Sequence, residues 1–282
     1  MKMRIIKIEK ITNEVSRLWQ EANFDLDSDV LDIIKKRSLK EKDPRVKDAF
    51  NVILRNAEIA RKEKRPICQD TGIPVVFLEI GQDVMIKGGD LVDAVNQGIR
   101  QGTKKGFLRH SVVNCPLVRK NTNDNTPAVI HTEIVKGAKL KISVMAKGAG
   151  SENCSRTKML LPTDGEREIG EFVVESIKLA SSNVCPPMII GLGIGGTLEK
   201  AVYLSKRALL APLGKINPDK KLKILEEKIA KKINKLKIGP NGFGGGTTVL
   251  ALRIAKYPCH IASLPVAINI SCHVHRHKEV II

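Results

Sequence analysis

The chain has 282 residues, of which 42% are hydrophobic and 28% charged, as is typical of a globular protein with a substantial core. No apolar run approaches the ~20 residues of a membrane span, and the start lacks the features of a signal peptide. We therefore expect a cytoplasmic protein that makes no membrane contact and keeps its six cysteines reduced. The net charge of +18 suits either a nucleic-acid-binding protein or an enzyme that attracts a small dianion. With only 3% aromatic residues, a surface that stacks bases is disfavoured.

The first part of the chain is predicted to be helical. Apolar residues at helical spacing predict a helix over residues 5–24. Asp27-Ser28-Asp29 can cap a second helix. Asp43-Pro44 predicts the start of a third, because proline is tolerated in the first turn. Residues 1–64 are thus expected to form a helical N-terminal subregion.

The stretch Arg65-Pro66-Ile67-Cys68-Gln69-Asp70-Thr71-Gly72 joins these helices to a strand predicted over residues 74–80. A thiol, an amide, a carboxylate and a hydroxyl follow one another between a proline and a glycine, at a connection where a scaffold can present side chains to a ligand. The stretch is either a metal-binding thiolate with polar groups that hold a substrate, or a buried cysteine in a capped turn. These eight residues alone favour the second interpretation.

Helices and strands are expected to alternate over the next hundred residues. Asp90 should cap a helix, which is followed by a loop at residues 106–110. Strands at residues 128–135 and 140–146, joined by Lys136-Gly137, predict an antiparallel hairpin. A flexible polar loop at residues 147–154 follows.

A glycine-rich segment lies between a buried strand at residues 188–192 and the helix that follows it. Residues 191–196 match the G-x-G-x-x-G pattern of dinucleotide sites. The acidic residue near the required distance, Asp219, opens a lysine-rich helix, which is the wrong context. We therefore interpret the segment as a turn that another backbone or a bound ligand approaches closely.

The remaining elements complete an α/β pattern. Helices are predicted at residues 166–179 and 219–237, and strands at 249–254 and 261–270. Three histidines alternate at positions 273, 275 and 277, and we expect them to lie exposed on one face of a terminal strand. Because no repeat or clear linker occurs, we expect one domain over residues 1–282: a helical lead-in followed by mixed sheets flanked by helices.

The cysteines all lie near glycine or proline turns at the ends of predicted elements. Iron–sulfur clusters are held by cysteine thiolates, but the spacing does not identify which of these cysteines would be ligands. The residues by themselves are thus compatible with a soft-metal site and leave its ligands open.

Four motifs in chain order carry a resemblance to a known family. They are Ile67-Cys68-Gln69-Asp70-Thr71-Gly72, Lys147-Gly148-Ala149-Gly150-Ser151-Glu152-Asn153, Cys185-Pro186-Pro187 with Gly195-Gly196-Thr197, and Ile270-Ser271-Cys272. The chain resembles the iron–sulfur (class I) fumarate hydratases, in particular the alpha subunit of the two-chain form. L-tartrate dehydratases share the Cys-Gln-Asp-Thr-Gly element at residues 68–72 and the Cys-Pro-Pro element at residues 185–187. The loop at residues 147–153 and the Gly-Phe-Gly-Gly loop at residues 242–245 look more fumarase-like.

The resemblance implies a [4Fe–4S] cluster with one iron that has no protein ligand and that acts as a Lewis acid on the substrate. Its implied ligands are Cys68, Cys185 and Cys272, while Cys115, Cys154 and Cys259 are taken as structural. Asp70 and His260 are the implied catalytic residues, and the residues implied to bind substrate are Gln69, Asp70, Arg109, Gly148, Gly150 and His260. The resemblance implies that the backbone N–H groups of the Gly148–Gly150 loop face the other substrate carboxylate, and the family often has glycine where this chain has Ala149.

The implied activity is the reversible hydration of fumarate to (S)-malate, a step of the tricarboxylic acid cycle. The alternatives within the family are the alpha subunits of L-tartrate dehydratase and mesaconate hydratase, and the alternative of another class is a basic nucleic-acid-binding protein. Single-chain relatives carry a further C-terminal domain that contains the catalytic base. The resemblance therefore implies a separate beta subunit, an α2β2 assembly, and a small dicarboxylate as substrate, without nucleic acid or membrane as partner.

Overall fold

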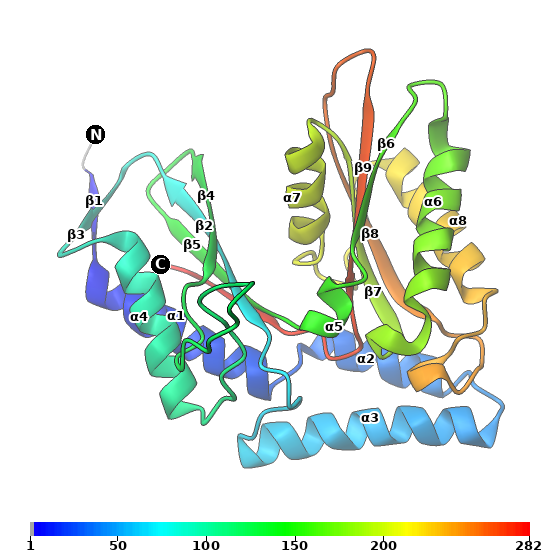
Figure 1. Ribbon diagram of the computed structural model, residues 1–282, viewed down its shortest axis with the longest axis horizontal. Helices are drawn as coiled ribbons and strands as arrows, with labels where there is room; N and C mark the ends of the chain where they lie inside the picture. The colour runs from blue at the N-terminus through cyan, green and yellow to red at the C-terminus, as the bar shows by residue number, and fades with distance from the viewer. Residues whose placement is uncertain (1–2) are drawn as a thin grey trace. The chain divides into compact units, whose positions relative to one another are not determined.

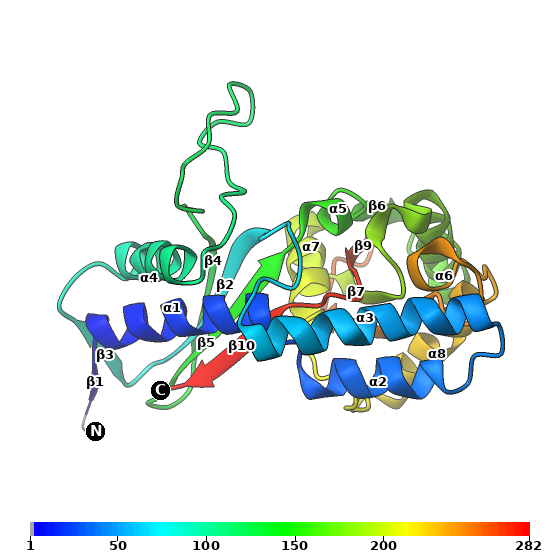
Figure 2. The ribbon, with the colours of Figure 1, turned by 90° about the horizontal axis from the view of Figure 1, so that it is seen from below.

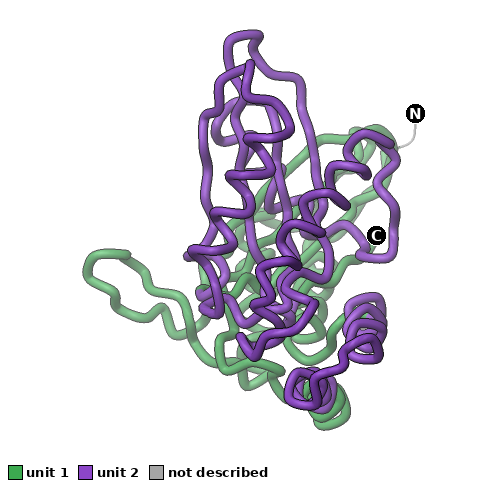
Figure 3. The backbone as a smooth tube through the Cα atoms, turned by 90° about the vertical axis from the view of Figure 1, so that its right-hand side faces the viewer, with its two compact units in different colours: residues 1–27, 56–149, 276–282 green, residues 28–55, 150–275 purple. Residues whose placement is uncertain are grey.

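A computed structural model describes residues 3–282 and has the mixed α/β fold that the sequence predicts (Figures 1 and 2). The chain forms two compact units (Figure 3). Of the described residues, unit 1 contains 3–27, 56–149 and 276–282, and unit 2 contains 28–55 and 150–275. The expected helical subregion is divided between the two units. That residues 1–282 act as one domain stays a prediction.

Unit 1 is built on a four-stranded sheet in the order β10-β5-β2-β4. Its strands are β2 (Ile73–Gly81), β4 (Val129–Val135), β5 (Leu140–Lys147) and β10 (His277–Ile281). A parallel pair is formed by β1 (Arg4–Lys7) and β3 (Val84–Lys87). The expected first helix therefore begins only at Ile8, after a strand.

Helices α1 (Ile8–Phe24) and α4 (Leu91–Lys105) supply the helical part of the unit 1 core. Apolar residues at helical spacing in α1 are buried, including Val15 and Trp19. The Trp19 indole donates to Thr103 Oγ1 at 3.0 Å, which joins α1 to α4. Asp90 caps α4 as expected, because its Oδ1 accepts from the Asp93 amide at 2.9 Å.

The predicted hairpin of β4 and β5 is wrong. Both strands form, but β2 lies between them, parallel to β4 and antiparallel to β5. β2 has an unbroken buried run from Val75 to Leu78, so its backbone groups need a hydrogen-bonding strand on each side. The Lys136-Gly137 turn passes the end of β2, where the Asp83 amide donates to the Gly137 carbonyl at 3.0 Å.

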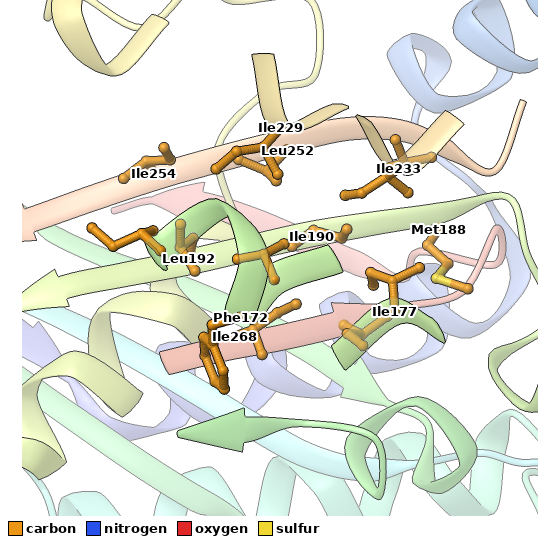
Figure 4. Packing of buried hydrophobic residues seen from close by; sticks show 14 of the residues in the cluster. Phe172, Ile177, Met188, Ile190, Leu192, Ile229, Ile233, Leu252, Ile254 and Ile268 are labelled. Atoms are coloured by element: carbon orange, nitrogen blue, oxygen red, sulfur yellow. The ribbon is translucent and has the colours of Figure 1, made fainter. Parts of the chain in front are cut away.

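Unit 2 is built on a four-stranded sheet in the order β6-β9-β7-β8. Its strands are β6 (Arg156–Leu160), β7 (Met188–Gly195), β8 (Val249–Tyr257) and β9 (Leu264–Ser271). One face packs on α6 (Gly165–Ala180) and α8 (Lys220–Asn234), and α7 (Leu198–Ala208) covers the other (Figure 1). Apolar side chains of α6, α8 and the strands, among them Phe172, fill the space between the layers (Figure 4).

Smaller elements complete the chain. α2 (Ser28–Ser38) and the 3₁₀ turns η1 (Ser181–Val184) and η2 (Pro240–Gly242) belong to unit 2. α3 (Pro44–Glu63) and α5 (Ala149–Glu152) each contain a point where the chain passes between units. Within residues 3–282, no helix is long and apolar enough to cross a membrane.

The glycine-rich segment allows α7 to pack directly on the backbone of β7. A Cβ on Gly191 would lie 1.9 Å from the Ser205 carbonyl oxygen, and one on Gly193 would lie 2.0 Å from that of Ala201. The expectation of a close backbone approach is confirmed. These glycines allow one layer of the unit to contact the next.

The three histidines near the C-terminus do not share a strand face, so this expectation is wrong. β9 ends at Ser271 and β10 begins at His277, with the chain passing from unit 2 to unit 1 between them. His275 is buried, with Nδ1 2.9 Å from Ser271 Oγ and Nε2 2.8 Å from the Leu209 carbonyl oxygen. A turn between two units replaces the expected single strand.

Candidate active-site residues

The turn at residues 67–72 connects α3 to β2 in unit 1 and is fixed from both sides. The Ile67 amide donates to the Asn23 carbonyl at 2.9 Å, and Asn56 Nδ2 donates to the Ile67 carbonyl at 2.9 Å. The half-buried Cys68 thiol lies 3.3 Å from Gln69 Oε1 and can donate to it. The Thr71 hydroxyl is buried and has no hydrogen-bond partner among the described residues. The turn thus presents a partly accessible thiol beside an unused buried hydroxyl.

Asp70 is the centre of the polar contacts in this turn. Its Oδ1 accepts from the Gly72 amide at 2.9 Å, and its Oδ2 accepts from the Ala149 amide at 2.8 Å. Arg109 Nη2 lies 3.4 Å from Oδ1. The structure therefore brings together two residues that the resemblance implicates, Asp70 and Arg109, and the start of the loop that contains Gly148. The Arg109 side chain is more than half exposed, which leaves its guanidinium accessible to a carboxylate.

Arg276 also contacts this turn, although no sequence motif points to it. It is only 3% exposed, and its Nη1 donates to the Asp70 carbonyl at 2.6 Å and to Asn23 Oδ1 at 3.0 Å. Its Nε has no hydrogen-bond partner among the described residues. A Cβ on Gly148 would lie 3.4 Å from both Arg276 Nη2 and Asp70 Oδ2. A lone arginine in a terminal strand is usually solvated, so the sequence alone does not single out Arg276. Its one sequence signal is its position four residues after Cys272.

Cys185 and Cys272 lie on adjacent loops of unit 2. β7 and β9 are antiparallel and Ile189 pairs with Ser271, so the start of β7 lies beside the end of β9. The Cys185 carbonyl accepts from the His273 amide at 3.3 Å and lies 2.8 Å from His273 Nδ1. Because a carbonyl can only accept, Nδ1 carries the proton. Burial lowers the pKa of His273 and favours its neutral form.

Gly150 lies near the same end of unit 2 as Cys185. A Cβ on Gly150 would lie 3.5 Å from the Asn183 carbonyl oxygen in η1, two residues before Cys185. The segment expected to be a flexible loop contains the short helix α5. The Ala149 amide, one of the donors expected to face substrate, already donates to Asp70.

His260 lies at the other end of the unit 2 sheet from Cys185 and Cys272. It belongs to the loop between β8 and β9, beside the end of β7 where Gly195 pairs with Tyr257. At the usual rise per residue, the eight residues of β9 span about 25 Å. The structure therefore does not bring His260 next to these two cysteines. His260 is exposed, and its Nδ1 accepts from the Ala262 amide at 3.1 Å.

The other three cysteines occupy different surroundings. Cys154 packs against the core of unit 2, and the Cys259 thiol lies 3.3 Å from the Ser263 carbonyl oxygen in the β8–β9 loop. Cys115 lies in the loop between α4 and β4 of unit 1, where the amides of Val118 and Leu117 lower the pKa of its thiol. None of the six cysteines forms a disulfide.

The chemistry of the donor set fits an iron–sulfur cluster. Cys68, Cys185 and Cys272 are accessible or half-buried thiols on loops, and thiolates are the soft ligands that iron–sulfur clusters take. Cys68 belongs to unit 1, whereas Cys185 and Cys272 belong to unit 2. Over residues 3–282, no group of three His, Cys, Asp or Glu side chains is placed to hold a metal ion.

The chain is similar to known proteins over nearly its whole length. The model of the family described as "Fumarate hydratase (Fumerase)" matches residues 12–281. A Methanocaldococcus jannaschii protein named "Putative L(+)-tartrate dehydratase subunit alpha" is 39% identical over 276 residues, which is 95% of each chain. The L(+)-tartrate dehydratase subunit alpha of Escherichia coli (strain K12) is 30% identical over 278 residues, which cover 98% of this chain and 91% of the relative.

Proposed function

Because the chain belongs to the fumarate hydratase (Fumerase) family of hydro-lyases, we propose that it is the alpha subunit of a two-chain enzyme that dehydrates L-tartrate. The observation that carries the choice of substrate is the 39% identity with a relative of that name over 95% of both chains. This replaces fumarate, which the motifs alone favour, as the first candidate. Fumarate remains the second candidate because the family description names fumarate hydratase and the loop at residues 147–153 resembles that of fumarases.

We assign the cluster to three cysteines. Cys68, Cys185 and Cys272 would hold a [4Fe–4S] cluster, for which their thiols provide suitable donors. When bound, the cluster supplies an iron without a thiolate ligand, a Lewis acid that makes hydroxide a feasible leaving group.

The residues around Asp70 would bind and orient the substrate. Arg109 offers two parallel N–H groups to a substrate carboxylate, and Gln69 offers an amide beside it. The Asp70 carboxylate is held by two backbone amides, so it can accept a hydrogen bond from a substrate hydroxyl and orient it without first reorienting itself. A Cβ on Gly148 would lie 3.4 Å from both Asp70 Oδ2 and Arg276 Nη2, so this glycine keeps the backbone beside the polar groups that would face the other end of a small dicarboxylate.

His260 requires a second copy of the chain if it acts on substrate. It lies about 25 Å from the loops with Cys185 and Cys272, which is too far for a hydrogen bond to a C4 substrate at that cluster. We therefore propose that His260 serves a substrate bound to another alpha chain. This is consistent with the α2β2 assembly that the resemblance implies.

The substrate assignment is tested by coexpressing the chain with its beta subunit, reconstituting iron and sulfide anaerobically, and assaying L-tartrate, fumarate and mesaconate in parallel. We expect L-tartrate to give oxaloacetate with the highest kcat/KM, and the alpha chain alone to show little turnover. A higher kcat/KM for fumarate would select the second candidate. Asp70→Asn is the matched control: it should lose turnover and keep the cluster absorbance. Absence of any hydro-lyase activity in the reconstituted complex would overturn the proposed function.

A further inference from the structure

The loop of residues 106–128 between α4 and β4, called here the arm, projects from the rest of unit 1 (Figures 2 and 3). Its tip carries two adjacent aliphatic side chains, Leu117 and Val118, which are 90% and 77% exposed. A single exposed leucine is ordinary on a protein surface. Two neighbouring aliphatic residues at the end of a projecting loop form a small apolar surface that unit 1 does not cover.

The base of the arm is held in place by a buried asparagine. Asn125 is fully buried, and its Oδ1 accepts from the Ser111 amide at 2.6 Å. Its Nδ2 donates to the Arg109 carbonyl at 3.0 Å and lies 3.4 Å from Thr103 Oγ1 of α4. These hydrogen bonds connect the outgoing and returning segments of the arm to each other and to α4.

The tip of the arm is also ordered by its own hydrogen bonds. Val113 and Asn121 form an antiparallel bridge, and the Asn114 amide donates to the Lys120 carbonyl at 2.9 Å. The Arg119 amide donates to the Cys115 carbonyl at 2.8 Å, which closes the turn. The arm thus holds its apolar tip in one conformation, and little further entropy is lost when such a loop binds a partner.

We propose that the tip of the arm, residues 115–118, docks into an apolar pocket of the beta subunit. The inference rests on the proposed function, since it names the surface that the predicted partner contacts. The arm also contains Arg109, whose carbonyl is bonded to Asn125 and whose side chain lies beside Asp70. Docking at the tip would therefore fix the loop that positions a substrate-binding residue.

The charge beside the tip favours a different protein, and not a second copy of this chain, as the partner that binds the arm. Arg119 and Lys120 follow the tip directly, so the tip is flanked by two positive charges. Two alpha chains that met at their arms would bring like charges together, which opposes association. The pocket that accepts the arm should accordingly be apolar at its floor and acidic at its rim.

The test compares two variants of the full alpha chain for binding to the purified beta subunit. Replacing both Leu117 and Val118 by serine should weaken the affinity at least tenfold, because the apolar area that these two side chains bury in the pocket would be lost. Leu39→Ser is the matched control: Leu39 is 79% exposed and follows α2 in unit 2, and its replacement should leave the affinity unchanged. Thermal unfolding of the isolated chain should be the same for all three proteins.

Cys115 provides a second readout without any substitution at the tip. The amides that lower the pKa of its thiol favour the thiolate, so it should react readily with iodoacetamide. Bound beta subunit should slow the alkylation of Cys115 at least tenfold in the wild-type chain, as measured on the peptide by mass spectrometry.

The outcomes separate this inference from the proposed function. If the wild-type chain binds the beta subunit and the double variant binds equally well, the arm is not the docking surface while the two-chain enzyme stands. If the wild-type chain does not bind the beta subunit at all, both fail. If the double variant instead abolishes self-association of the alpha chain and keeps its affinity for the beta subunit, the occupant is a second copy.

Discussion

Arg276 holds the backbone of the turn that carries Cys68, Gln69 and Asp70. Its guanidinium is buried and donates to the Asp70 carbonyl and to Asn23 Oδ1. The backbone carbonyl of Asn23 in turn accepts a hydrogen bond from the Ile67 amide. Hydrogen bonds from a charged donor are worth more than neutral ones, and a buried acceptor that loses its donor is costly. We therefore regard Arg276 as a positioning residue for this turn.

Arg276→Met should lower the free energy of unfolding by about 2–4 kcal/mol, because it leaves two buried acceptors without a donor. It should also speed amide hydrogen exchange at residues 67–72 in the chain without a cluster. Arg276→Lys should restore part of the protection, since it keeps a charged donor. Arg167→Met, on the exposed surface of α6, is the control and should change stability little. Unchanged exchange at residues 67–72 in Arg276→Met would contradict the positioning role.

The three proposed ligands can be separated from the other cysteines one residue at a time. Serine at position 68, 185 or 272 should abolish the visible absorbance of the anaerobically reconstituted chain, because each removes one of three thiolates. Serine at position 115, 154 or 259 should leave the absorbance and the iron content unchanged. Loss of the visible absorbance on substitution of Cys115, Cys154 or Cys259 would show that the ligands are assigned wrongly.

The contact between α7 and β7 depends on the absence of side chains on the strand. In Gly191→Ala, the new Cβ would lie 1.9 Å from the Ser205 carbonyl, so helix and strand must separate. Overpacking of this kind costs about 1–3 kcal/mol or more. Gly214→Ala is the control, since a Cβ added there would have no neighbouring atom within 4 Å. Urea unfolding should show a loss of stability for Gly191→Ala only. Equal unfolding midpoints for the two variants would mean that α7 and β7 can move apart at no cost.

Sequence patterns predicted most elements but not the order of the strands. Helical spacing and caps identified α2, α3, α4, α6 and α8 because these signals are local. The predicted pairing of β4 with β5 is wrong because strands that follow each other along the chain need not be neighbours in the sheet. Pairing is decided by the burial of the whole strand, and β2 required neighbours on both edges.

The candidate site was predicted in part for a similar reason. Cys68, Asp70 and Arg109 belong to motifs whose resemblance points to a function, and the structure brings Asp70 and Arg109 together. Arg276 carries no motif, and its importance comes from burial, which depends on residues more than 200 positions away in the chain. The distance of His260 from the cysteine loops follows from strand direction, which spacing alone does not show.

On the scale of the assembly, His260 should act on another copy of the chain. His260→Ala and Cys185→Ser are each expected to inactivate the complex. When the two variants are coexpressed in equal amounts with the beta subunit, activity should return to about one quarter of wild type, because half of randomly paired dimers contain one intact site of two. The reconstituted mixtures are assayed anaerobically. No recovery would place His260 and the cluster in the same copy, and full activity of His260→Ala alone would remove this residue from the mechanism.

The interleaving of the two units determines how the molecule would respond to a pulling force. Residues 3–27 and 276–282 both belong to unit 1, and the two segments of unit 2 are inserted between parts of unit 1. If the chain is held at residues 3 and 282 and stretched, tension enters through unit 1, where β10 is hydrogen-bonded along β5. Once β10 has separated from β5, the tension passes directly into unit 2 at His275. Because Cys272 lies only five residues before the start of β10, its loop should be the first of the proposed ligand loops to extend.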